Sequence, residues 1–93
     1  MTSHLLVAEG ARAAVPGTGF TLAVDSVRHR IGSTGEGEIA RSMMTAVLTL
    51  FEGGRQVAQG RAIDGERLRL GTLAVTLIGR GADPSTVELD VGP

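Results

Sequence analysis

The sequence predicts a small all-β protein, an antiparallel β-sandwich or flattened barrel of seven or eight short strands. Glycine is the main punctuation: 14 of the 93 residues are Gly, and short runs of Val, Leu, Ile and Thr lie between them. Turn signals recur about every ten residues, which is typical of sandwiches and barrels. Several runs also alternate apolar with polar side chains, the pattern of a strand with one buried face.

Each apolar run between turn signals is expected to form a strand. The expected strands are Leu5–Ala8, Ala11–Val15, Phe20–Ile31, Val57–Ile63, Arg67–Leu70, Leu73–Ile78 and Val87–Val91. The pairs Gly53-Gly54 and Asp64-Gly65 are expected to form hairpin turns, because glycine readily adopts positive φ. The strand 73–78 is apolar on both faces, so we expect both of its faces to be covered.

The longest expected strand changes parity near its middle. Leu22 and Val24 are apolar at even positions, whereas Val27 and Ile31 are apolar at odd positions. One extra residue at 25–26 would return both sets to the same face of the sheet. The sequence therefore predicts a β-bulge there.

The segment Glu38–Glu52 fits two structures. Its polar residues fall within an arc of roughly 100° on a helical wheel, and Ser33 and Glu36 have the spacing of a capping box. Its Thr, Val and Phe residues prefer strands, however. We favour a strand at 43–51 preceded by a polar loop. The alternative is an amphipathic helix at about 36–52, which would make the protein an α+β fold with one helix on an antiparallel sheet.

The composition excludes several kinds of chemistry. The chain has no cysteine, and all nine basic residues are arginine. Disulfides, zinc–thiolate sites, Schiff-base lysines and P-loops are therefore excluded. The net charge of −1 produces no strong field toward nucleic acid or anionic membrane, and Phe20 and Phe51 are the only aromatic residues. We expect no nucleic-acid partner, no membrane insertion and no cofactor.

The length and the N-terminus define the expected organisation. Residues 1–93 are expected to form a single domain. The N-terminal segment has no basic region followed by a long apolar run, so it does not predict a signal peptide. The chain as given is expected to be cytoplasmic, and extracytoplasmic if a leader was removed.

Arg28, His29 and Arg30 form the one cluster that suggests a binding site. Neighbouring residues of a strand point to opposite faces. With the bulge in place, His29 would face the core, and Arg28 and Arg30 would lie in solvent. Glu36 and Glu38, in the next Gly-rich turn, are expected to be solvated carboxylates. The three residues 28–30 are nevertheless kept as candidate binding residues.

No catalytic or metal site is expected. Histidine occurs only as His4 and His29. A metal site would need both rings and a carboxylate, and we expect His4 to lie in a terminus that frays. Asp25, Ser26 and His29 are too close in sequence to predict a catalytic triad.

The segment 67–89 resembles the opening of a forkhead-associated domain. In that family a strand ends in Ile-Gly-Arg, which here is Ile78, Gly79 and Arg80. The resemblance implies that Arg80 helps to hold a phosphothreonine peptide, and we include Arg80 among the candidate binding residues. The Ser-x-x-His segment that follows in the family is absent.

The sequence thus favours a non-catalytic interaction or assembly module that binds protein through a sheet edge or an apolar face. Self-association is expected for the same reason, because few charges guard the edges of the apolar strands. One alternative is a small α+β ligand-binding or hot-dog-like enzyme domain with a pocket near His29 and Glu38. Another is an anion- or phosphopeptide-binding β module that uses the candidate arginines.

Overall fold

The computed structural model describes residues 2–32, 41–81 and 85–93, and the side chains of 2–28, 44–79, 81 and 85–93. All of its regular structure is β-strand. The strands are β1 (Ser3–Ala8), β2 (Arg12–Ala14), β3 (Phe20–Gly32), β4 (Arg41–Glu52), β5 (Arg55–Ile63), β6 (Arg67–Leu70), β7 (Leu73–Arg80) and β8 (Thr86–Gly92).

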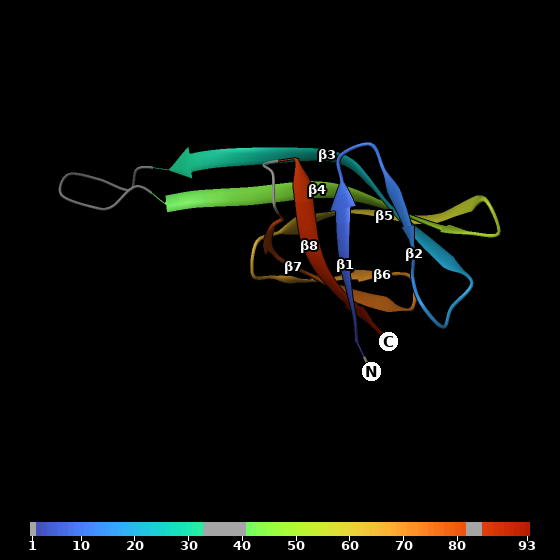
Figure 1. The fold of residues 1–93 in the computed structure, drawn as a ribbon. Coiled ribbons are helices and arrows are strands. Elements are labelled where there is room, and N and C mark those ends of the chain that lie inside the picture. Colours follow the sequence, from blue (N-terminus) through green and yellow to red (C-terminus); the bar gives the residue numbers. More distant parts are fainter. Residues whose placement is uncertain (1, 33–40, 82–84) are drawn as a thin grey trace.

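The strands form two four-stranded antiparallel sheets, which confirms the predicted sandwich. Sheet A has the order β1-β8-β7-β6, and sheet B has the order β2-β3-β4-β5. Figure 1 shows the two sheets, with the long strands β3 and β4 reaching beyond the strands of sheet A. The molecule measures 50 × 22 × 20 Å.

The core lies between the sheets and is aliphatic. Alternate residues of the central strands point inward, so that each strand contributes every second side chain. The largest fully buried side chains are Leu22, Val24, Leu48, Leu50, Leu70, Val75, Leu77, Val87, Leu89 and Val91. Sheet B contributes mainly leucines, and Leu22 and Leu48 come from its two central strands.

The predicted β-bulge is present in β3. The register with β4 runs from Val24 opposite Leu48 to Ser26 opposite Val47, so Asp25 is the extra residue. Val24 is buried and Val27 packs against the core, so both lie on the inner face despite the change of parity. The period-two pattern therefore located the bulge.

The helix considered for residues 36–52 is wrong over the part that the structure describes. Residues Arg41–Glu52 form β4, a central strand of sheet B. Its inner positions carry Met44, Ala46, Leu48 and Leu50, which are all buried. Tertiary pairing on both sides outweighs the amphipathic helical pattern, because a central strand satisfies its backbone groups on both edges. Residues 33–40, including the expected capping box, lie outside the described residues.

The Asp64-Gly65 turn is not a hairpin turn as predicted. It joins β5 of sheet B to β6 of sheet A and so turns a corner between the sheets. Gly60 lies close to the inner side of this corner: a Cβ atom there would come within 3.1 Å of side-chain atoms of both Leu68 and Leu70. The Gly53-Gly54 hairpin is confirmed, with positive φ at both residues.

The expectation that both faces of residues 73–78 are covered is also wrong. Leu73, Val75 and Leu77 are buried, but Ile78 is 43% exposed. Ile78 is the extra residue of a bulge in β7, because Leu77 pairs with Leu89 and Gly79 with Glu88. The second face of this strand is the outer surface of sheet A.

The ends of β3 and β4 together form a projection that we call the arm, residues 28–32 and 41–44, and Met44 at its base is still part of the buried core. β2 pairs with Thr21–Ala23 alone among the residues of β3. On the other side of the sheet, the pairing of β5 with β4 ends at Ile63 opposite Thr45. The arm is therefore a two-stranded ribbon that continues the central strands of sheet B beyond the two outer ones (Figure 1).

Candidate functional site

The structure places three of the four predicted site residues on the arm. Arg28, His29 and Arg30 are consecutive residues of β3, and they pair with Thr45, Met44 and Met43 of β4. The side chain of Arg28 is exposed, as the alternation predicts. The side chains of His29 and Arg30 lie outside the described part, so the inward direction predicted for His29 stays a prediction.

Arg80 lies elsewhere in the fold. It is the last residue of β7 and pairs with Val87 of β8 in sheet A, whereas the arm belongs to sheet B. Its side chain is outside the described part. Glu36 and Glu38 also lie outside the described residues.

The outer edge of β3 is the edge that faces away from β4. The direction of the backbone N–H and C=O groups shows which residues present hydrogen-bonding groups there. The backbone N–H of Val27 donates to the Glu9 carboxylate at 2.6 Å, so it points away from β4. Backbone directions alternate along a strand, and the N–H and C=O groups of His29 and Ile31 therefore point the same way. On the partner strand, the Met44 carbonyl accepts a hydrogen bond from the Asp64 N–H, which agrees with this phase.

The bulge residue Asp25 organises a small polar cluster where the arm meets the rest of sheet B. Its carboxylate accepts a hydrogen bond from the Thr49 hydroxyl, and the Gln59 side-chain amide lies 3.4 Å from the same oxygen. Thr49 is only 3% exposed and is a buried polar residue outside the apolar core. A β-bulge that re-aims a side chain in this way is a usual means of fixing where a strand bends.

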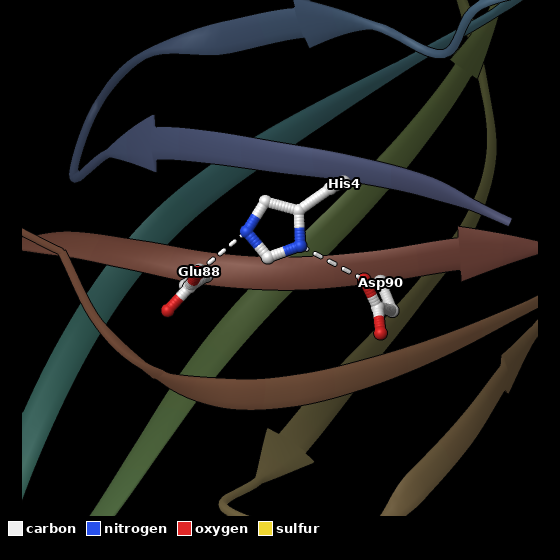
Figure 2. Close-up of polar contacts among 3 residues, drawn as sticks. All are labelled: His4, Glu88 and Asp90. Atoms are coloured by element: carbon white, nitrogen blue, oxygen red, sulfur yellow. Dashed lines mark hydrogen bonds and ion pairs between the residues drawn. The ribbon is translucent and has the colours of Figure 1, made fainter.

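A second polar cluster lies on the outer face of sheet A and was not predicted. His4 of β1 pairs with Asp90 of β8, and its ring lies between the carboxylates of Glu88 and Asp90 (Figure 2). His4 Nε2 is 2.5 Å from Glu88 Oε1, and His4 Nδ1 is 3.0 Å from Asp90 Oδ1. The expectation that the terminus frays at His4 is therefore wrong, because the residue lies inside a paired strand.

The geometry of this cluster selects the protonated ring. Each ring nitrogen faces a carboxylate oxygen, and only the imidazolium has a proton to donate from both nitrogens. Hydrogen bonds to Asp90 and then to Glu88 raise the pKa of His4 above its ordinary value of 6.5. The side chain is 51% exposed, so solvent and salt screen these interactions.

The cluster does not have the geometry of a metal site. A metal ion would need one ring nitrogen and both carboxylates on the same side, whereas here the carboxylates lie at opposite edges of the ring (Figure 2). In the part of the chain that the structure describes, no group of three His, Cys, Asp or Glu side chains is arranged to hold a metal ion. The same residues include no helix able to span a membrane.

Sequence reasoning missed this cluster because its parts lie at opposite ends of the chain. His4 and Asp90 are 86 residues apart. The signal that was present is the spacing of Glu88 and Asp90, which places two carboxylates on one face of the last strand. Only the antiparallel pairing of β1 with β8 brings the histidine between them.

Comparisons with protein-family models, with curated proteins and with solved structures find no match to this chain. No matching family therefore stands behind the resemblance of residues 67–89 to a forkhead-associated domain.

Proposed function

We propose that this chain is a non-catalytic protein-interaction module whose partner adds an extended strand to the outer edge of β3 in the arm. The observation that carries the proposal is the mismatch between β2 and β3. β2 pairs with Thr21–Ala23, while β3 continues to Gly32. From Arg28 onward, none of the described strands pairs with that edge.

Two physical arguments support an added strand at this place. A two-stranded ribbon is marginally stable by itself in water, so a third strand would stabilise the arm. An unpaired edge also presents main-chain donors and acceptors in the register that an extended peptide needs. Because backbone directions alternate along β3 from the outward N–H of Val27, the free donors are the N–H groups of His29 and Ile31. The acceptors on this edge are the C=O groups of Val27, His29 and Ile31.

Three of the other edges, those of β2, β5 and β6, are less suitable. β2 is three residues long, and β6 is four residues long with exposed Arg67 and Arg69. β5 carries a bulge at Val57, which lies between the paired residues Gln56 and Ala58. Short strands, charges and bulges are the usual features that keep an edge from pairing.

Glu9 determines where an added strand would begin. Its carboxylate accepts a hydrogen bond from the N–H of Val27, which is the first donor after the bulge that points to the outer edge. A partner strand would therefore pair from the carbonyl of Val27 toward Gly32. Arg28 is exposed beside this edge and would lie next to outward-facing side chains of the partner.

The test is a proline that removes one edge donor and leaves the β3–β4 pairing intact. Proline lacks the N–H and is tolerated in a strand where that group faces outward. Ile31→Pro removes an outward N–H, and Ile31→Thr is the matched control with the backbone unchanged. Circular dichroism and the urea midpoint verify that both variants keep the fold.

Two probes report binding: peptides selected against the wild-type protein from a random-peptide phage library, and a second copy of the chain, followed by sedimentation velocity. We expect Ile31→Pro to weaken peptide binding or self-association at least tenfold, and Ile31→Thr to retain it. The proposal is wrong if Ile31→Pro leaves both unchanged, or if no peptide is selected and the chain stays monomeric at millimolar concentration.

A further inference from the structure

The cluster of His4, Glu88 and Asp90 joins an edge strand to its neighbour at a titratable group. β1 is the outermost strand of sheet A, and β8 is its one partner within that sheet. The contacts of His4 bridge the two strands from the outer face (Figure 2). On the inner face, Val7 is buried in the core and Leu5 packs against it.

We propose that His4 is a pH-sensitive latch, which holds β1 on sheet A when protonated and lets β1 open when it loses its proton. The latch is separate from the binding edge proposed for β3, since it belongs to the other sheet. The imidazolium donates to both carboxylates at once. The neutral ring has one N–H, so its second nitrogen would direct a lone pair at a carboxylate oxygen.

The loss of the proton also changes the charge balance on β8. Glu88 and Asp90 are two residues apart on the same face of the strand, so without the imidazolium they are adjacent like charges. The groups that face the cluster from β7 are uncharged: Thr76 is opposite Asp90, and Gly79 is opposite Glu88. Among the described side chains, the ring is therefore the one that brings a positive charge to both carboxylates.

Among the side chains that the structure describes, the next charged one on this face by strand register is Arg67 of β6, which is opposite Thr76. Its backbone lies two strands away from that of Asp90, about 10 Å at the usual strand spacing. In the described part of the chain, the ion pairs of Glu88 and Asp90 are with His4 and not with Arg67. Arg67 therefore does not replace the imidazolium.

The direction of the pH effect follows from the raised pKa of His4. Hydrogen bonds to Asp90 and Glu88 raise it above 6.5 in the folded protein. The stabilisation of β1 is thus fully present below pH 6.5 and is lost as the pH rises through the raised value. Opening of β1 would expose Val7 and the edge of β8 that β1 now covers, so that sheet A presents a new unpaired edge at higher pH.

Native-state hydrogen exchange measures this opening directly. Protection factors of the β1 amides that bond to β8 are compared with those of β4 between about pH 5.5 and pH 9. For the wild type we expect β1 protection to fall roughly three- to tenfold across this range, while β4 stays better protected than β1 throughout. High salt should reduce the change, because the cluster is exposed.

Two variants separate the latch from other effects. His4→Gln is expected to give the low β1 protection at every pH, whereas His29→Gln, at the one other histidine, is expected to behave as the wild type. An NMR titration of His4 supplies the pKa itself. The proposal is overturned if the His4 pKa is at or below 6.5, or if His4→Gln keeps the wild-type protection and pH dependence.

Discussion

The arm and the body of the sandwich share two strands but differ in what surrounds those strands. In the body, β3 and β4 have strands on both sides and face sheet A, and Leu22 and Leu48 are fully buried. In the arm, the same two strands continue beyond β2 and β5. Hydrogen-bonded pairing between two strands does not by itself make a region self-sufficient. Neighbouring strands and a second layer supply most of the stability.

The largest expected effect is in the body. Leu48→Ala removes a fully buried side chain at the centre of β4, and we expect the free energy of unfolding to fall by about 2–5 kcal/mol. Urea denaturation measures it. A cost below about 1 kcal/mol, in the range of a surface substitution, would mean that the sheets are not packed as described.

The corner between the sheets should respond next. Gly60→Val places branched carbons where Leu68 and Leu70 already approach within 3.1 Å of an added Cβ. We expect a loss of about 1–3 kcal/mol from overpacking. Gly19→Val is a control at a position with no atom within 4 Å and no positive φ, and thermal unfolding should separate the two.

The junction of body and arm is expected to be intermediate. Asp25→Ala removes the acceptor of the buried Thr49 hydroxyl and should cost about 1–3 kcal/mol. Adding Thr49→Val should recover part of this loss, because no buried donor then lacks an acceptor. A double-mutant cycle in urea tests the coupling, and strictly additive effects would contradict it.

The pH dependence of stability should be smaller, because the His4 cluster is exposed. His4 has a raised pKa through its bonds to Asp90 and Glu88. Its contribution is therefore present below pH 6.5 and disappears as the pH rises past the raised value. The urea midpoint of the wild type should decrease over that range by more than the midpoint of His4→Gln. Equal decreases would remove His4 as the cause.

The smallest effect should be in the arm. Arg28 is exposed on β3, and we expect Arg28→Ala to change the free energy of unfolding by no more than about 0.5 kcal/mol. The same variant should affect binding of peptides to the β3 edge more than it affects folding. A loss of stability as large as that of Leu48→Ala would erase the distinction between arm and body.

Local patterns predicted most of the fold. Apolar runs between turn signals located seven strands, and a change of parity located the bulge at Asp25, because one residue of slippage exchanges the two faces of a strand. The segment 41–52 was ambiguous because its side chains fit a helical face as well as a strand. Its strand state is settled by pairing with β3 and β5, which no local window contains.

The site was less predictable than the fold. The sequence singled out Arg28, His29 and Arg30, and the structure places them on the arm. The sequence alone does not show that the edge of β3 beside these residues is unpaired. That depends on β2 pairing with β3 only as far as Ala23. The pairing of β1 with β8, which assembles the His4 cluster, is likewise a long-range property.

That pairing also affects the order of folding. The β1–β8 ladder closes a loop of nearly the whole chain, with Ser3 opposite Val91, and contacts of such sequence separation are costly to form early. We expect β1 to dock after the transition state. Substitutions in β1 would then accelerate unfolding and leave the refolding rate unchanged, which stopped-flow chevrons of Val7→Ala can measure. β1 would be the last of the described strands to fold.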